Sequence, residues 1–169
     1  YDCLVAAKEQ GKVKKIGISV YSPQELEALF KRFPVDLVQL PLNILDQRFA
    51  DSGWLTTLER GGVEIHSRSA FLQGLLLMPT HERPPQFHKW TDFWIKWDKW
   101  LKETGKSPVE VCLSAIFSHT EINRIVIGFD SIQQLQQICN TPLDPSMKIP
   151  IQLKSAPEDL INPSRWAKL

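Results

Sequence analysis

Short apolar runs alternate with amphipathic segments along most of this chain. Residues 35–40 are apolar almost throughout, which is typical of a parallel strand covered on both faces. Residues 23–33 instead place Leu26, Leu29 and Phe30 on one helical face. The alternation of the two patterns predicts an α/β fold with parallel strands.

The pattern predicts four strand–helix units. Strands are expected over residues 14–19, 35–40, 63–68 and 124–128, and helices over 2–10, 23–33, 52–60, 88–103, 107–119 and 131–139. Ser22 and Ser107 each open a Ser-Pro-x-Glu run, which is a strong helix start. With right-handed crossovers, the units form either half of an eight-fold βα barrel or a small open α/β sheet. We expect one domain over 1–141 and a Pro-rich tail over 142–169 that lies on the surface.

Composition narrows the class of protein. The chain has 169 residues, 43% hydrophobic and 23% charged, and a formal net charge of +1. This balance gives no electrostatic reason to expect nucleic acid or an anionic membrane as a partner. No apolar run approaches the roughly 20 residues that span a bilayer. The chain opens on Tyr1 without the features of a signal peptide, and we expect it to be a fragment or a processed piece.

The cysteines and histidines do not indicate a metal site. Cys3, Cys112 and Cys139 are odd in number and widely spaced, and no CxxC or His ligand spacing accompanies them. We therefore expect neither disulfides nor zinc, and we expect the reducing cytoplasm as the location. The sequence also lacks a Ser/His/Asp order, a Cys/His pair, a P-loop and paired carboxylates, so no catalytic residue is assigned.

Three places at the ends of predicted strands could carry binding chemistry. Ser19 and Gln39 end neighbouring strands, where a hydroxyl and a carboxamide could bind a planar ligand that bears an amide; two plain strand ends are the alternative. Arg68 could meet a phosphate bidentately or could be a solvated side chain. The turn from Gly128 to Ser131 could bind phosphate at a helix N-terminus, but an ordinary capped turn explains it better.

A stripe of aromatic residues is the last feature that could carry binding chemistry. Trp90, Trp94, Trp97 and Leu101 recur at helical spacing. They could form an aromatic wall for a substrate, but such a stripe is more often a face that packs on the core, and we favour the core.

Four segments in order resemble the aldo-keto reductase family. Gly11-Lys-Val-Lys-Lys-Ile-Gly-Ile-Ser19 resembles the family's GKVRxIGxSN, and Val35-Asp-Leu-Val-Gln39 with Asn43 and Arg48 resembles vdxvQxxyNxxxR. The run from Ser69 to Gly74-Leu-Leu resembles YSPLxxGxL, and Val126-Ile-Gly128 with Gln134-Leu135 resembles vixGxxsxxQLxxN. The resemblance covers the chain to about residue 140.

The resemblance implies an α/β fold, a partial (β/α)8 barrel of about four βα units that correspond to family strands five to eight. It implies an oxidoreductase that uses NADP(H) and a small-molecule carbonyl substrate. Ser19 and Gln39 would bind the nicotinamide carboxamide, and Arg68 stands where the family has the Tyr that stacks on the ring. The pyrophosphate would lie along Ser69, Phe71 and Gln73, and the adenosine ribose and its phosphate would lie near Gly128, Ser131 and Gln134.

Some positions depart from the family pattern. Val20 stands where the family has an Asn, and Arg68 stands where it has the Tyr that stacks on the nicotinamide ring. Ile138 stands where the family has the Asn that contacts adenine. Asp130 stands near the family's basic residue and disfavours a 2′-phosphate, which leaves NAD(H) open beside NADP(H).

The family's catalytic Asp, Tyr, Lys and His belong to the other half of the barrel. We therefore expect this chain to be inactive alone. The alternative is a non-catalytic module of this fold that binds a nucleotide or a partner. Open strand edges would favour a homo-oligomer.

Overall fold

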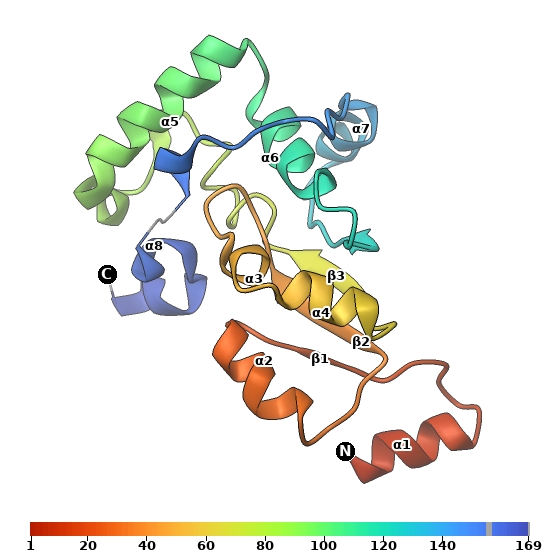
Figure 1. Cartoon of the computed structure of the whole chain (residues 1–169). Coiled ribbons are helices and arrows are strands. Elements are labelled where there is room, and N and C mark those ends of the chain that lie inside the picture. The colour runs from red at the N-terminus through yellow and green to blue at the C-terminus, as the bar shows by residue number, and fades with distance from the viewer. Residues whose placement is uncertain (155–156, 169) are drawn as a thin grey trace.

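Four parallel strands form one sheet in the order β1-β2-β3-β4. In the computed structural model of the chain, which describes residues 1–154 and 157–168, the strands are β1 (Gly17–Ser19), β2 (Leu37–Pro41), β3 (Glu64–Arg68) and β4 (Arg124–Ile125). The strand order and the parallel direction confirm the predicted run of βα units (Figure 1).

The two outer strands are shorter than predicted. The strand expected over 14–19 begins at Gly17, because its partner β2 begins only at Leu37, which is paired with Gly17. The strand expected over 124–128 ends at Ile125. Its neighbour β3 ends at Arg68 and the chain then turns away, so the residues that follow Val126 have no strand to pair with on that side.

Most of the helices correspond to predicted ones, but those at residues 48–51 and 158–161 were not predicted, and the helices expected over 52–60 and 88–103 begin only at Trp54 and Thr91. They are α1 (Asp2–Glu9), α2 (Pro23–Phe30), α3 (Arg48–Asp51), α4 (Trp54–Arg60), α5 (Thr91–Thr104), α6 (Pro108–Phe117), α7 (Ile132–Asn140) and α8 (Glu158–Ile161). The hydroxyls of Ser22, Ser107 and Ser131 accept hydrogen bonds from the backbone N–H three residues later, at 3.2, 3.1 and 3.2 Å. Each of these serines is therefore an N-cap, as predicted.

The core lies between the sheet and its helices. Val38, Leu40 and Ile65 are wholly buried on the sheet face that the helices cover. Among the alternating residues of the same strands, Gln39 and His66 are only half-buried. In a parallel sheet successive side chains point to opposite faces, so the second face of this sheet is left open.

The aromatic stripe belongs to the core, as predicted. Trp94 and Trp97 on α5 are 2% and 0% exposed, and the Trp94 indole N–H donates to the Phe87 carbonyl at 3.0 Å. Phe87 lies in the 3-10 turn Pro85–Trp90, which replaces the first turn of the helix expected over 88–103. The side chains fill space under α5 and are not available as a wall for a ligand.

The segment after Pro142 is more than a surface tail. It holds the 3-10 turns Ile151–Leu153 and Pro163–Lys168 on either side of α8, and it buries Leu153, Leu160 and Ile161. The ring of Trp166 packs edge-on against Phe87, with ring centroids 4.7 Å apart. The expectation of a segment lying on the surface is wrong for these side chains, which are buried with the rest of the core. The domain division at residue 141 stays a prediction.

Candidate functional site

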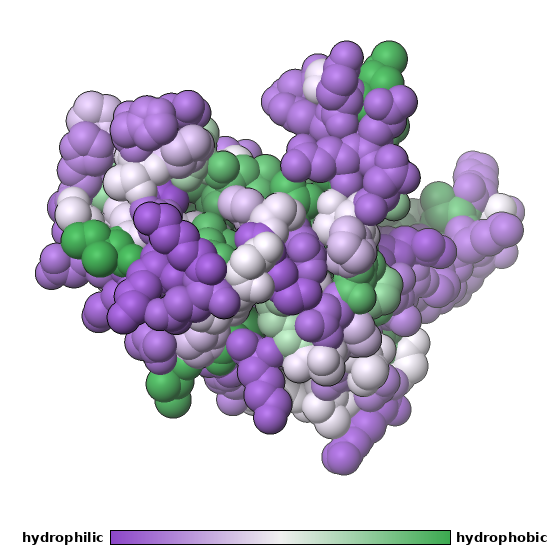
Figure 2. All heavy atoms as spheres, turned by 90° about the horizontal axis from the view of Figure 1, so that it is seen from above, coloured by the Kyte–Doolittle hydropathy of each residue, from purple (hydrophilic) through white to green (hydrophobic). Residues whose placement is uncertain are grey.

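A cleft of about 750 Å³ lies at the carboxyl ends of β3 and β4. Three segments that are far apart in the sequence line it: the loop after β3, the start of α6, and the stretch from β4 into α7. Figure 2 shows hydrophobic residues in a hollow of the surface seen from above, between hydrophilic projections. The volume lies within the range of small-molecule and cofactor sites.

Most of the predicted binding residues meet at this cleft. The predicted residues that line it are Arg68, Ser69, Phe71, Gln73, Gly128 and Gln134. Among the described residues, Ser19, Gln39 and Ser131 lie outside its lining. Pro108, Val109 and Gln137 also line it. The sequence marked Pro108 and Val109 only as the start of a helix, and nothing in the sequence marked Gln137 as a binding residue.

Ser19 and Gln39 lie side by side in the sheet, but only Ser19 ends its strand, whereas Gln39 is the middle residue of β2. They are register partners in β1 and β2, and the same register continues from Gln39 to His66 and from His66 to Arg124. The four side chains therefore form one row across the open face of the sheet. The expected placement of the two residues on neighbouring parallel strands is confirmed, the expectation that Gln39 ends its strand is wrong, and their role in binding stays a prediction.

Arg68 is held in place by its neighbours. Its guanidinium donates to the Val20 carbonyl at 3.1 Å and to the Ser69 hydroxyl at 3.3 Å, and it lies 4.4 Å from the centre of the Tyr21 ring. One face of the guanidinium is thus covered by an aromatic ring. Tyr21 was missed in the sequence, because nothing there shows that it reaches a residue of the third strand.

Left-handed backbone gathers in the loop after β3. Ser69, Leu72 and Gln73 have φ angles of 64°, 48° and 54°, although none of them is glycine, and Gly74 follows at 82°. We call residues 69–74 the strap. Such conformations cost about 1–3 kcal/mol each and persist where surrounding contacts enforce them, often at ligand sites. Leu72, which is wholly buried, anchors the strap.

The turn into α7 is held by two hydrogen bonds between its own residues. The Ser131 hydroxyl accepts from the Gln134 N–H at 3.2 Å, and the Gln134 side-chain oxygen accepts from the Asp130 N–H at 2.8 Å. The ordinary capped turn that the sequence favours is therefore present. Asp130 and Arg68 are the charged side chains among the described residues that line the cleft.

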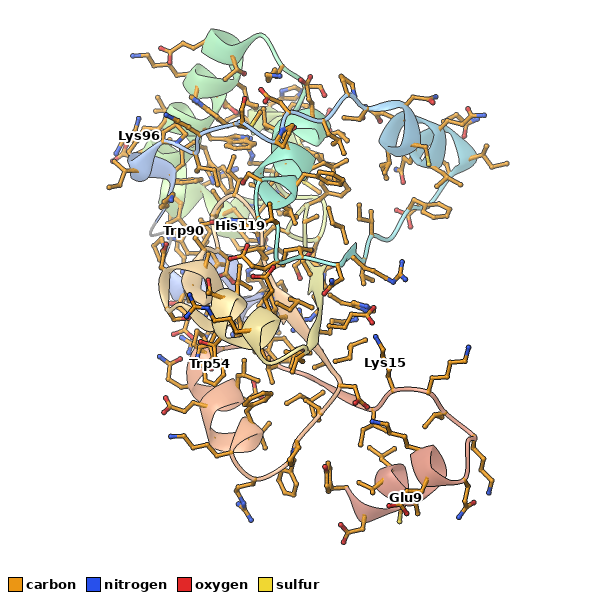
Figure 3. All side chains as sticks on the ribbon, turned by 45° about the vertical axis from the view of Figure 1, so that its right-hand side comes forward. Glu9, Lys15, Trp54, Trp90, Lys96 and His119 are labelled. Atoms are coloured by element: carbon orange, nitrogen blue, oxygen red, sulfur yellow. The ribbon has the colours of Figure 1, made fainter. Side chains whose placement is uncertain are left out.

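A charged cluster occupies the open face of the sheet. The carboxylate of Glu64 pairs with Lys15, lies 2.7 Å from the His66 ring nitrogen, and lies 3.5 Å from Arg124. Lys15 is labelled in Figure 3 near the start of β1. Hydrogen bonds from Lys15 and His66 to the charged form lower the pKa of Glu64 to about 2.

No group of three or more His, Cys, Asp or Glu side chains within 1–154 and 157–168 is arranged to hold a metal ion. Cys3 and Cys139 are exposed free thiols, and Cys112 is a buried one. Helices long and apolar enough to cross a membrane are absent from the described part of the chain.

A model of the Aldo/keto reductase family matches residues 1–147, which are most of the chain. The chain belongs to the aldo/keto reductase family. The match includes all four strands, the strap and α7. The comparison with curated proteins found no match.

Solved structures of aldo-keto reductases share the fold. The holo form of aldo-keto reductase AKR11C1 from Bacillus halodurans is 22% identical, with a TM-score of 0.66, over 95% of this chain and 58% of that one. Its apo form is 23% identical, with a TM-score of 0.63, over 85% and 51%. The thermostable aldo-keto reductase Tm1743, solved with the inhibitor epalrestat, is 15% identical, with a TM-score of 0.59, over 98% and 52%.

The chain spans a little over half the length of these structures. Its four parallel βα units are therefore a partial (β/α)8 barrel, and the open face of the sheet is the face that looks into a complete barrel. At this level of identity the likeness shows the fold alone.

Proposed function

We propose that this chain is the cofactor-binding half, barrel strands five to eight, of an NAD(P)(H)-dependent aldo/keto reductase. The observation that carries the proposal is the cleft of about 750 Å³ at the carboxyl ends of β3 and β4, the end of a parallel barrel where active sites lie. Family membership and the strained strap on its wall support the same function.

The residues present fit a dinucleotide in size and in chemistry. The strap and the turn at Gly128 border the cleft from opposite elements, and Arg68 brings a fixed cation to its wall. Ser19 and Gln39 would hold the carboxamide, while Ser69, Phe71 and Gln73 would lie along the pyrophosphate. Gly128, Ser131 and Gln134 would lie near the adenosine ribose. A bound nicotinamide cofactor supplies a hydride for a small-molecule carbonyl, and this chain binds and orients it.

The cofactor is NADP(H) by family resemblance, with NAD(H) as the other candidate. Asp130 is the carboxylate on the cleft wall, and a 2′-phosphate close to it would be repelled. We assign no catalytic residue to this chain and expect it to be inactive alone. The exposed thiols of Cys3 and Cys139 suit a reducing location, and we propose the cytoplasm.

A second candidate is a non-catalytic module that binds a nucleotide or a partner. The observation that favours it is the engagement of Arg68, whose guanidinium is already occupied by Val20, Ser69 and Tyr21. Ile138, at the position of the family's adenine-reading Asn, also lines the cleft. Both features reduce the number of polar contacts that the cleft could make with a dinucleotide.

We also propose that the purified chain associates with a second copy. The β1 and β4 edges lie at the two ends of the sheet, and exposed edges invite pairing with another chain. Helix α7 lies wholly in the described part of the chain and buries none of its residues. Its Ile132 side chain is 70% exposed and is therefore available for contact with a second copy.

The test is a titration of the chain with NADPH and with NADH, followed by calorimetry and by the fluorescence of the reduced cofactor. We expect saturable binding at one site and no reduction of a carbonyl substrate. Binding of neither cofactor at millimolar concentration would refute the cofactor-binding proposal. Steady NAD(P)H-dependent turnover by the chain alone would refute its expected inactivity.

A further inference from the structure

One buried side chain connects the loop after β2 to the strap. Asn43 is wholly buried, and its side-chain oxygen accepts from the backbone N–H groups of Leu45 and Asp46 at 3.0 Å each. Its side-chain nitrogen donates to the Ser69 carbonyl at 3.1 Å. Asn43 thus closes its own loop with one end of the amide and reaches the neighbouring loop with the other.

The Ser69 carbonyl is the point where the strap begins. Ser69 has a φ of 64°, and its carbonyl also accepts from the Leu72 N–H at 2.9 Å, which closes the first turn of the strap. A residue other than glycine stays in this left-handed region only where contacts from the surrounding structure hold it there. Next to it, the Leu42 N–H donates to the Arg68 carbonyl at 3.1 Å, so the two loops are joined at successive residues.

The loop that carries Asn43 is itself firmly held. The Gln47 side-chain nitrogen donates to the Asn43 carbonyl at 2.6 Å, and the Gln47 side-chain oxygen lies 3.0 Å from the His119 ring nitrogen. His119 follows α6 and is labelled in Figure 3. Arg48 donates to the buried carboxylate of Asp46 at 2.8 Å. Asn43 is therefore a fixed donor rather than a mobile one.

We propose that Asn43 is the positioning residue of the strap. It acts through Ser69: the bond from its amide holds the left-handed turn, and the turn sets where Ser69, Phe71 and Gln73 lie on the cleft wall. Asn43 itself lies outside the described lining of the cleft. The expected effect on cofactor affinity rests on the proposed cofactor function. The expected effect on the conformation of the strap does not depend on it.

The chemistry of the site requires an amide. A carboxylate keeps the two accepted bonds and loses the donated one, whereas alanine loses all three. The N43D variant therefore removes the donor to the Ser69 carbonyl and places a carboxylate oxygen against it, while the two accepted bonds stay in place. The N123D variant is the control, because the Asn123 side-chain oxygen accepts from the Ile65 N–H at 2.6 Å and the same change leaves that bond in place at the other end of β3.

The experiment measures amide hydrogen exchange of residues 69–77, the urea midpoint, and the affinity for NADPH and NADH. We expect N43D to raise exchange in the strap and to weaken cofactor binding, each by about tenfold, as for one lost buried hydrogen bond. We expect N123D to change neither. In N43D, the rise in amide exchange of the strap should be larger than the rise that its shift in the urea midpoint predicts. A general loss of stability would not produce this difference.

A pH series adds a second readout. Protonation of the N43D carboxyl returns a donor toward the Ser69 carbonyl, so strap protection should recover as the pH falls. The charged and titratable groups around this position are Asp46, its partner Arg48 with Glu158 beyond it, His119 beyond Gln47, and Arg68 beside Ser69, and N43D shares all of them with the wild type. The comparison at each pH therefore isolates the introduced carboxyl.

The outcomes separate the two proposals. If the wild type binds neither cofactor, the proposed function fails, and strap exchange still decides the role of Asn43. Equal strap exchange in N43D and wild type overturns the inference. If N43D does not fold, the S69G background relieves the left-handed strain and should restore a folded N43D chain. Failure of S69G to reduce the effect of N43D also overturns it.

Discussion

Ser19 and Gln39 lie side by side as register partners in β1 and β2, and the Val20 N–H holds this register by donating to the Gln39 carbonyl at 2.9 Å. We expect S19A and Q39A each to weaken NAD(P)H binding by about three- to tenfold, the range of one hydrogen bond. The double variant should show a smaller loss than the sum, because both side chains would hold one ligand group.

Calorimetric titration of the four chains measures this coupling. The S118A variant is the control, since the Ser118 hydroxyl donates to the Ala115 carbonyl at the end of α6. Full additivity, or binding unchanged by either substitution, would show that the pair does not share a ligand.

Asp130 should set the preference between the two cofactors. We expect D130K to raise the NADPH-to-NADH affinity ratio about fivefold, because a cation replaces the carboxylate on the cleft wall and charge contacts near a surface are worth on the order of 1 kcal/mol. The ratio should fall toward the wild-type value in high salt. D92K, at the exposed first turn of α5, adds the same charge elsewhere. An equal shift in D92K would assign the effect to net charge.

The Glu64 cluster should make stability depend on acid pH. Lys15 and His66 lower the pKa of Glu64 from 4.5 to about 2 in the folded chain, so the folded state favours the carboxylate. The stabilisation is complete above about pH 4.5 and is lost as the pH falls toward 2. Urea unfolding should therefore show a wild-type advantage over E64Q that shrinks across this window.

The matched control for this series is E27Q, which removes an exposed carboxylate that pairs with Lys31 on α2. Its difference from wild type should stay small at every pH, as is usual for an exposed pair. An E64Q difference that is constant between pH 5 and pH 2 would contradict the role assigned to the cluster.

Association of the purified chain should depend on α7. We expect light scattering to give a mass that rises with concentration, and the I132K variant to lower it, because a charge on the unburied face of α7 opposes apolar contact. I95K is the control, since Ile95 is 59% exposed on α5, away from the sheet edges. A monomer at all concentrations, or equal effects of both variants, would argue against association through α7.

The segment after Pro142 should contribute to the stability of the whole chain. We expect L160A to lower the free energy of unfolding by about 2–5 kcal/mol, because Leu160 is wholly buried and its loss leaves a cavity. I151A, in the same segment, should change it little, since Ile151 is 82% exposed. Urea unfolding of both variants measures the contrast, and equal midpoints would mean that this segment packs independently of the core.

Local signals in the sequence predicted the elements well. Ser22, Ser107 and Ser131 cap helices because a hydroxyl that precedes an amphipathic run satisfies a free N–H within three residues. The extent of the outer strands was missed, because pairing ends where the neighbouring strand ends and not where apolar residues end. The left-handed turns at Ser69 and Leu72 were also missed, since no glycine marks them.

The sequence by itself determined the alternation of strands and helices, their caps and the family, because these depend on patterns within a few tens of residues. Only the tertiary structure decided that the strap, the start of α6 and the turn before α7 enclose one cleft, and that Asn43 reaches Ser69 across two loops. Contacts of this kind depend on how the strands are registered and how the loops fold over their ends, and no local pattern of residues encodes that geometry.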